Sequence, residues 1–321
     1  MTAHAATIEM FTSPTIRIAT RASRLALWQA EHVAAVLQKV HPGAVVNLVP
    51  LSTLGDRDVR EPLSQLGSLG VFTREVQLAV LENRADVAVH SLKDLPTDET
   101  PGLRLVAVPE RGPTSDALVF PQSQPGPKSL GDLPPGARIG TGSLRRRAQL
   151  LHHRPDWDFA DVRGNVETRL RKLDAGDYDA LVLAVAGLTR LGLAARISCE
   201  LAPPLMHFAV GQGALGIECR VDDAITRAAL SKIDHEPTHR ATRAERALLA
   251  ELRAGCHAPV GVWTETTGGN LRLEAVVLSR DGRTRLIADA TGSAADPEQL
   301  GRHVAEQLRS QGADELIQSN S

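Results

Sequence analysis

Two periods of apolar residues alternate along the N-terminal part of the chain, one typical of strands and one typical of helices. Residues 16–20 alternate as a short strand, and the apolar positions of residues 25–37 recur at helical spacing. Residues 45–51 indicate a second strand, residues 71–81 a helix and residues 86–90 a buried strand. This alternation predicts an α/β domain with a largely parallel sheet, whose ligands gather at the carboxyl ends of the strands.

The same alternation recurs further along the chain and predicts a second α/β domain. Strands expected at residues 103–108 and 116–120 lead from the first domain towards it. Its other expected elements are strands at residues 137–140, 158–162 and 179–185 and helices at residues 166–173 and 186–191.

The chain is then expected to return to the first domain. Residues 209–220 combine a glycine turn with an apolar strand that suits the first sheet, which makes that domain discontinuous and gives a two-strand hinge. After these residues, glycine-containing turns at 268–270 and 281–282 indicate antiparallel strands and a small α+β domain. The elements expected in this last part of the chain are helices at residues 222–233, 238–253 and 297–311 and strands at 260–264, 271–279 and 285–290.

The periods therefore divide the chain into a short tail and three domains. Residues 52–70 have glycines, charges and no sustained period, which predicts a mobile loop of lid type. The expected parts are a flexible tail at residues 1–14, domain 1 at residues 15–112 and 212–234, domain 2 with an anion cleft at residues 113–211, and domain 3 at residues 235–321.

The composition narrows the class of protein. Hydrophobic residues make up 42% of the 321 positions and charged residues 23%, as in a soluble globular protein. No apolar run could span a membrane and the N-terminus lacks a signal-peptide pattern, so we expect a cytoplasmic protein. The 3 cysteines include no C-x-x-C pair, which indicates reduced thiols and no metal site. Aromatic residues are only 3% and the net charge is −2, which argues against a nucleic-acid partner.

Basic residues nevertheless concentrate within residues 139–172. A strand there leads into Thr141, Gly142 and Ser143, a turn suited to begin a helix whose free N–H groups attract an anion. Residues 163–165 repeat this arrangement before a second helix, and the planar fork of arginine suits capture of carboxylates or phosphates. The basic residues of the segment are Arg145, Arg146, Arg147, Arg154, Arg163, Arg169, Arg171 and Lys172.

An alternative interpretation of Arg145, Arg146 and Arg147 is a solvated helix face. Consecutive helical residues point about 100° apart, so at most two of the three arginines can face one ligand. Arg147, which is followed by the core-like pattern of Ala148 and Leu151, is expected to be the structural one.

Polar residues also follow the strands of the first domain. Arg21 and Ser23 come after its first strand, and Lys93 and Asp94 come straight after the buried strand at residues 86–90. These positions are carboxyl ends of strands, where ligands of α/β domains bind. The alternative for Lys93 and Asp94 is a surface turn in which Asp94 caps a helix.

Cys256 lies in a glycine-containing loop between a helix and a strand. His257 or Arg253 would lower the pKa of its thiol and make it reactive, whereas most cysteines are inert small hydrophobes. A cysteine hydrolase that uses Cys256 and His257 is a further alternative, although adjacent residues rarely bring a thiol and an imidazole into hydrogen-bonding geometry.

Six motifs, in order from about residue 16 to the C-terminal helix, together resemble the porphobilinogen deaminase (hydroxymethylbilane synthase) family. They are HSLKDLP around Lys93, GTGSLRRRAQL around Arg145, VRGNVETRLRKL around Arg163, LAVAGLTRLGL around Arg190, AVGQGALGIECR around Gln212 and AGCHAPVG around Cys256.

The resemblance implies a transferase of porphyrin biosynthesis with two α/β domains like type II periplasmic binding proteins and a small C-terminal α+β domain. It implies a monomer that joins four porphobilinogen molecules head to tail, releases ammonia, and frees the linear tetrapyrrole hydroxymethylbilane by hydrolysis. A dipyrromethane cofactor, bonded to Cys256 through a thioether, would carry the growing chain without a metal.

The resemblance also implies the site residues. Every porphobilinogen brings an acetate and a propionate, so the growing chain is a polyanion that needs many cations. Asp94 matches the catalytic aspartate, because a carboxylate near pyrrole N–H groups can stabilise developing positive charge and assist proton transfer. The residues that match cofactor and substrate binding are Arg21, Ser23, Lys93, Thr141, Ser143, Arg145, Arg146, Arg163, Arg169, Arg190 and Gln212.

Four positions depart from the family pattern. Arg24 stands where a proline is common, Gly142 where a second serine is common, and Ala254 where a glycine often precedes Gly255. Leu69 stands where a lysine is frequent in the 52–70 loop, so the resemblance does not imply a lysine contribution to this lid. The runner-up is a non-catalytic anion-binding or sensor protein on the same two-lobed fold, which would give no role to Asp94 and Cys256 together.

Overall fold

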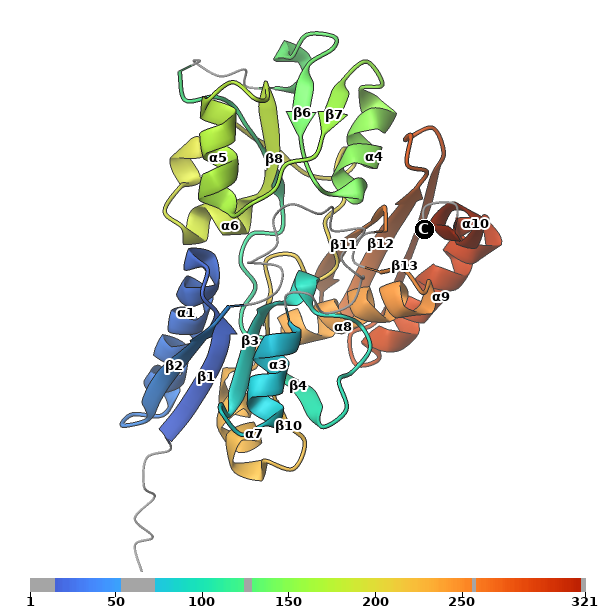
Figure 1. Cartoon of the computed structure of the whole chain (residues 1–321). Coiled ribbons are helices and arrows are strands. Elements are labelled where there is room, and N and C mark those ends of the chain that lie inside the picture. The colour runs from blue at the N-terminus through green and yellow to red at the C-terminus, as the bar shows by residue number, and fades with distance from the viewer. Residues whose placement is uncertain (1–14, 53–72, 124–128, 256–257, 319–321) are drawn as a thin grey trace, which may run out of the picture.

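The computed structural model describes residues 15–52, 73–123, 129–255 and 258–318. Their helices and strands gather around three sheets, two in the lobes of an α/β body and one in a smaller C-terminal part (Figure 1). The tail expected at residues 1–14, nearly all of the loop expected at 52–70, and Cys256 lie outside the described residues. Within those residues no helix has the length and apolarity needed to cross a membrane.

The first lobe is built on a sheet of strand order β2-β1-β3-β10-β4. Strands β1, β2 and β3 are parallel, and β10 is antiparallel to its two neighbours β3 and β4. The apolar strand expected within residues 209–220 therefore does return to the first sheet. The elements of this lobe are β1 (Thr15–Arg21), α1 (Arg24–Val40), β2 (Val45–Leu51), α3 (Arg74–Leu81), β3 (Val87–Ser91), η1 (Leu92–Asp94), β4 (Leu103–Ala107), β10 (Leu215–Arg220), α7 (Ala224–Leu230) and η4 (Ser231–Ile233).

The second lobe repeats this plan with the strand order β7-β6-β8-β5-β9, in which β5 is the antiparallel strand. The sequence pattern did not predict the edge strand β9, because three residues are too few to show a period. The elements are β5 (Asp116–Val119), η2 (Leu130–Asp132), β6 (Arg138–Gly140), α4 (Leu144–His153), β7 (Asp158–Ala160), α5 (Val166–Asp174), β8 (Ala180–Ala184), α6 (Val185–Arg190), η3 (Ala194–Arg196) and β9 (Cys199–Leu201).

The C-terminal part is an antiparallel sheet, β11-β12-β13, covered by helices. Gly268 and Gly269 form the tight turn between β11 and β12, and both have positive φ, 57° and 83°, which glycine adopts without strain. Its elements are α8 (Glu236–Glu251), β11 (Val260–Thr267), β12 (Asn270–Leu278), β13 (Arg285–Ser293), α9 (Pro297–Ser310) and α10 (Ala313–Gln318). This arrangement is the small α+β domain expected from the hairpin signals.

Each sheet has its own aliphatic core, as the scarcity of aromatic residues requires. Ile18 and Leu37 are fully buried in the first lobe, Ile139 and Leu181 in the second, and Leu273 in the C-terminal part. A fully buried aliphatic side chain contributes about 1.5–3 kcal/mol through its removal from water. These cores make each sheet a rigid base for the side chains at its edge.

Two segments, residues 108–115 and 202–214, run between the lobes side by side. The amide of Gly112 donates to the carbonyl of Gly213 at 3.1 Å. Gly213 has a φ of 82°, and a Cβ there would lie only 2.6 Å from the carbonyl oxygens of Gly112 and Pro113. The close approach of the two segments therefore requires glycine. We call this pair of connecting segments the hinge, after the expectation from the sequence.

Candidate active site

The polar residues of the first lobe lie at one edge of its sheet because β1 and β3 are parallel neighbours. Arg21 ends β1, and Lys93 and Asp94 lie in η1, which follows β3 directly. Ser23 is the N-cap of α1, and its Oγ accepts a hydrogen bond from the amide of Ala26 at 3.4 Å. The expected gathering of these residues at the carboxyl ends of the strands is thus observed.

Two buried leucines hold η1 on the sheet. Leu92 is 1% exposed and Leu95 is 7% exposed. The amide of Leu92 donates to the carbonyl of Ala214 at 3.0 Å, and Gly216 leaves room for the Leu92 side chain, which a Cβ would approach to 2.9 Å. With its leucines turned inwards, η1 leaves Lys93 half-buried and Asp94 exposed.

In the second lobe the turn from β6 into α4 is fixed by its own hydroxyl groups. Thr141 Oγ1 accepts from the amide of Ser143 at 3.2 Å, and Ser143 Oγ accepts from the amide of Arg146 at 3.5 Å. Ser143 is therefore the N-cap of α4, as the sequence predicted. Both hydroxyl groups act within the turn and set the direction in which the first residues of α4 leave it.

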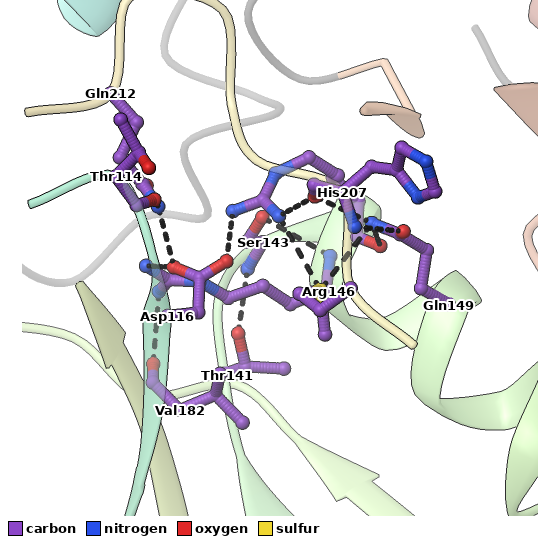
Figure 2. A network of polar contacts seen from close by, with 11 residues as sticks. Thr114, Asp116, Thr141, Ser143, Arg146, Gln149, Val182, His207 and Gln212 are labelled. Atoms are coloured by element: carbon purple, nitrogen blue, oxygen red, sulfur yellow. Dashed lines mark hydrogen bonds and ion pairs between the residues drawn. The ribbon is translucent and has the colours of Figure 1, made fainter. Parts of the chain in front are cut away.

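Arg145 and Arg146 turn inwards and meet at the buried carboxylate of Asp116, the first residue of β5. Figure 2 labels Arg146 and Asp116 in this network. Arg146 donates from Nε and Nη2 to Asp116 Oδ1 at 3.0 and 2.7 Å, and Arg145 Nη2 lies 2.8 Å from Oδ2. Arg145 Nη1 also donates to the carbonyl of His207 at 2.5 Å. A solvated helix face is therefore excluded for these two arginines, whereas Arg147 is exposed and does not point into the core.

The two guanidinium groups keep Asp116 ionised. Burial by itself would raise the pKa of this carboxyl, but the charges and hydrogen bonds of Arg145 and Arg146 outweigh burial and hold the pKa at about 2. Two cations against one anion leave one net positive charge at this point. Removal of Asp116 would leave two buried cations without a compensating anion.

Gln212 joins the same network from the hinge (Figure 2). Its Nε2 donates to the carbonyl of Thr114 at 2.6 Å and to Asp116 Oδ1 at 3.0 Å. The residue is fully buried, and its Oε1 has no hydrogen-bond partner among the described residues.

Two further cations lie close to this network with less compensation. Burial lowers the pKa of Lys93 to about 8, and the nearby charges of Arg146 and Arg145 act in the same direction against those of Asp94 and Asp116. Burial also lowers the pKa of Arg169 to about 10, with Arg146 and Arg163 adding to the effect. Arg169 Nε donates to the carbonyl of Gly164 at 2.8 Å, which fixes it at the start of α5. An anion bound here would relieve the repulsion among these cations.

Asp94 is the exposed carboxylate at the same junction. It lies within electrostatic range of Lys93 on its own lobe and of Arg169 on the opposite lobe. No hydrogen bond or ion pair of its side chain is found among the described residues, so the surface turn does not use Asp94 as a helix cap. The carboxylate is thus available to a ligand.

Arg190, at the end of α6, reaches across to the hinge and to α1. Its Nη2 donates to the carbonyl of Gly213 at 2.6 Å, and its guanidinium carbon lies 5.5 Å from the centre of the Trp28 ring. Burial lowers the pKa of Arg190 to about 10. The structure therefore places Arg190 at the contact between the two lobes.

The structure brings most of the expected residues together where the lobes meet. Sequence reasoning missed Asp116, although an acidic residue at the start of an apolar strand was a visible signal. Cys256 lies outside the described residues. The expected residues that gather around the junction are Lys93, Asp94, Thr141, Ser143, Arg145, Arg146, Arg163, Arg169 and Gln212, with Arg21 and Ser23 at the sheet edge and Arg190 at the hinge.

Two family models match nearly the whole chain. The model described as "Porphobilinogen deaminase, dipyromethane cofactor binding domain" matches residues 16–228. The model described as "Porphobilinogen deaminase, C-terminal domain" matches residues 239–310. Together with the three sheets, these matches confirm the expected fold class of two α/β lobes and a small C-terminal α+β domain.

Several solved structures are similar to parts of the chain at low identity. The periplasmic VFT2 domain of BvgS from Bordetella pertussis is 13% identical with a TM-score of 0.41, and the match covers 68% of this chain and 86% of that one. A putative methionine-binding lipoprotein from Bacillus subtilis is 13% identical with a TM-score of 0.41, covering 68% and 89%. The probable amino-acid transporter binding protein ytmK from Bacillus subtilis is 11% identical with a TM-score of 0.40, covering 74% and 97%.

Proposed function

The chain belongs to the porphobilinogen deaminase family, and on this premise we propose that Asp94 is its catalytic carboxylate and that the cations around it hold the carboxylates of cofactor and substrate. Members of the family are transferases of tetrapyrrole biosynthesis that act as hydroxymethylbilane synthases with a dipyrromethane cofactor. This family assignment decides against an anion sensor and against a cysteine hydrolase.

The residues at the junction fit a dipyrromethane. Its acetate and propionate groups require cations, and Lys93, Arg169 and Arg190 are basic groups whose pKa values burial lowers. Its pyrrole N–H groups require acceptors, and Gln212 Oε1 is a buried acceptor without a donor among the described residues. When bound, the group supplies the free pyrrole carbon to which further units are added.

We assign two tasks to the cations. Lys93, Arg163 and Arg169 would bind carboxylates directly, because no carboxylate among the described residues forms a close ion pair with them. Arg145 and Arg146 would not bind a carboxylate directly, because Asp116 holds them in place; their net positive charge would attract the bound anion through electrostatics. Arg21, Ser23, Thr141, Ser143 and Gln212 would complete the set, and Arg190 would act from the hinge.

Asp94 would act on the incoming porphobilinogen. As ammonia leaves, positive charge develops on the pyrrole nitrogen, and a carboxylate that accepts the pyrrole N–H stabilises this charge. The same carboxylate can assist the transfer of a proton at the reacting ring. The observation that carries this assignment is that the Asp94 carboxylate is exposed directly after β3, within electrostatic range of Lys93 and Arg169, and has no hydrogen-bond partner of its own among the described residues.

The substitution Asp94→Asn tests the assignment. Because the side chain is exposed, we expect the variant to fold normally and to lose kcat by at least about 100-fold. Asp98→Asn is the matched control, since Asp98 is an exposed carboxylate in the same loop and should leave kcat unchanged. Turnover of Asp94→Asn at the wild-type rate, measured as hydroxymethylbilane formed from porphobilinogen, would contradict the assignment.

We further propose that Cys256 carries the cofactor. The thiols of the two described cysteines ionise poorly, because burial raises the pKa of Cys199 and raises that of Cys219 to about 11. The intact mass of the purified protein should exceed the sequence mass by one dipyrromethane, and Cys256→Ser should lack this excess. Cys199→Ser is the control and should keep it. An excess that survives in Cys256→Ser would place the attachment elsewhere.

The remaining proposals concern the domain bounds, the location and the oligomeric state of the protein. We propose that the domains are bounded as residues 15–112 with 212–234, 113–211 and 235–321, in line with the return of β10 to the first sheet. We propose a cytoplasmic monomer without a nucleic-acid partner, supported by the free thiols of Cys199 and Cys219 and by the use of the buried arginines within the protein.

A further inference from the structure

An arginine of the C-terminal part holds the loop that carries Asp94. Arg246, on α8, donates from Nη1 to the carbonyl of Leu95 at 2.9 Å and from Nη2 to the carbonyl of Pro96 at 2.6 Å. These carbonyl groups belong to the two residues that follow Asp94. In Figure 1, α8 lies beside the first lobe, and its other side faces the sheet of the C-terminal part.

The loop depends on such contacts because η1 has little structure of its own. Its three residues are closed by one backbone hydrogen bond, from the amide of Leu95 to the carbonyl of Leu92 at 3.2 Å. Pro96 has no N–H to donate, and the residue before a proline is driven out of helical conformation, so the helix stops at Asp94. Leu92 and Leu95 fix the inner side of the loop, and Arg246 holds its C-terminal end.

The neighbour of Arg246 on α8 holds the hinge. Glu245 is 1% exposed, and its carboxylate accepts from Arg111 Nη1 at 2.6 Å and from the amide of Gly211 at 2.7 Å. Arg111 Nε in turn donates to the carbonyl of Gln212 at 2.7 Å. Consecutive residues point about 100° apart on a helix, so α8 reaches the Asp94 loop with one side chain and the hinge with the next.

Two carboxylates lie within electrostatic range of Arg246, the buried Glu218 and the exposed Glu99. Glu218 on β10 is 4% exposed and is within electrostatic range of Arg246. Its own partners are His90, whose Nε2 lies 2.9 Å from Glu218 Oε2, and Gln77, whose Nε2 donates to the same oxygen at 2.9 Å. Glu218 therefore keeps two partners when Arg246 is removed, so the loss falls on the loop carbonyls rather than on this buried carboxylate.

We propose that Arg246 is a positioning residue that, through the carbonyl groups of Leu95 and Pro96, fixes the loop that carries the carboxylate of Asp94. The inference rests on the proposed catalytic role of Asp94. It makes the C-terminal part, which contains Cys256, a direct support of the site in the first lobe. Substrate does not have to touch Arg246, because the side chain acts through the backbone of the residues after Asp94.

The substitutions Arg246→Gln and Arg246→Lys test the proposal in the cofactor-loaded protein. Misplacement of a reacting group by about 1 Å can lower a rate by up to about 100-fold, so we expect kcat of Arg246→Gln to fall about tenfold with KM for porphobilinogen nearly unchanged. Arg246→Lys keeps a cation but loses the fork of two donors, so its kcat should lie between that of the wild type and that of Arg246→Gln. Arg243→Gln is the control, because Arg243 lies on the same helix and pairs with the surface residue Glu298.

Hydrogen exchange of the backbone amides of Lys93, Asp94 and Leu95 supplies a readout that does not depend on catalysis. Arg246→Gln should speed their exchange about tenfold, whereas Arg243→Gln and Asp94→Asn should not. A wild-type kcat in Arg246→Gln, or a lower kcat without faster exchange at these amides, would overturn the proposal. Faster exchange in Arg246→Gln together with full activity of Asp94→Asn would support the tether and refute the role of Asp94.

Discussion

At the scale of single residues, one carboxylate decides how the arginines of the site are used. Asp116 pairs with Arg145 and Arg146 inside the second lobe and also accepts from Gln212 on the hinge. The side chains of Arg145, Arg146 and Gln212 are thereby ordered in advance. A preorganised charge of this kind stabilises a bound anion without a cost of reorganisation at the moment of binding.

The pKa of Asp116 makes its contribution dependent on pH. Its folded value of about 2 is below the ordinary 3.8, so its stabilisation is complete above about pH 4 and is lost as the pH falls from about 4 to about 2. A difference of this size corresponds to about 2–3 kcal/mol. Asp116→Asn should lower the free energy of unfolding at pH 7 by about 3–5 kcal/mol, because two arginines then stay buried without an anion.

Urea unfolding of wild type and Asp116→Asn at several pH values measures this effect. The difference in free energy of unfolding should shrink as the pH falls from 4 to 2, since the wild-type carboxylate is then protonated. Asp281→Asn removes an exposed carboxylate that accepts a hydrogen bond from Ser279, and it should change the free energy of unfolding little at any pH. A difference for Asp116→Asn that stays constant from pH 7 to pH 2 would show that charge is not the cause.

At the scale of elements, α1 and α6 join the two lobes on the side of the hinge. Arg190 of α6 lies over Trp28 of α1, and the rings of Trp28 and His32 stack with centroids 5.1 Å apart and planes within 6°. Burial and the charge of Arg190 lower the pKa of His32, so its imidazole is neutral at pH 7. The indole of Trp28 therefore contacts one cation, Arg190, and one neutral ring, His32.

Trp28→Leu should weaken this contact between the lobes. A largely desolvated cation–π contact is worth about 2 kcal/mol, and an exposed one about 0.5–1 kcal/mol. We expect Trp28→Leu to lose more stability in urea unfolding than Trp263→Leu, whose partner Arg272 lies 5.6 Å from the ring and is 42% exposed. Only Trp28→Leu should also lower kcat/KM for porphobilinogen. Equal losses of stability in the two variants would contradict a stabilising contact between Arg190 and Trp28 that is stronger than an exposed one.

The sequence predicted the elements well where a period was long enough to show. Residues 45–51 were predicted as a strand and are β2, and the glycine pair at residues 268–269 correctly indicated a hairpin. The strand β9 at Cys199–Leu201 and the helix α10 at Ala313–Gln318 were not predicted, because three and six residues carry too few apolar positions.

The site was predictable as far as the carboxyl ends of strands could be located. Lys93 and Asp94 follow a strand of obvious apolar character, so their place at the sheet edge came from local pattern alone. The partners of Asp116 and Arg246 lie far away in the sequence, 30 residues for Arg146 and 150 for Pro96. Contacts of this kind depend on how elements far apart in the chain pack together, which no local period records.

At the scale of the whole molecule, the C-terminal part is joined to the rest at several points. Glu245 and Arg246 reach the hinge and the Asp94 loop, and the backbone of Phe208 pairs with that of Val262 on β11 through two hydrogen bonds of 2.8 Å. His207 adds a contact of 2.7 Å from its Nε2 to Glu274 of β12. Motion of the C-terminal part would therefore displace both the hinge and the Asp94 loop.

The place of β10 between β3 and β4 also bears on how the protein is made. A ribosome delivers β4 more than 100 residues before β10, and until β10 arrives β4 has no partner in the first sheet. The second lobe, whose strands end at Leu201, is complete earlier. During synthesis the later lobe can therefore close first, and the N-terminal lobe waits with an open sheet edge for residues 215–220. A chaperone that binds unpaired strand edges would meet this protein in that interval.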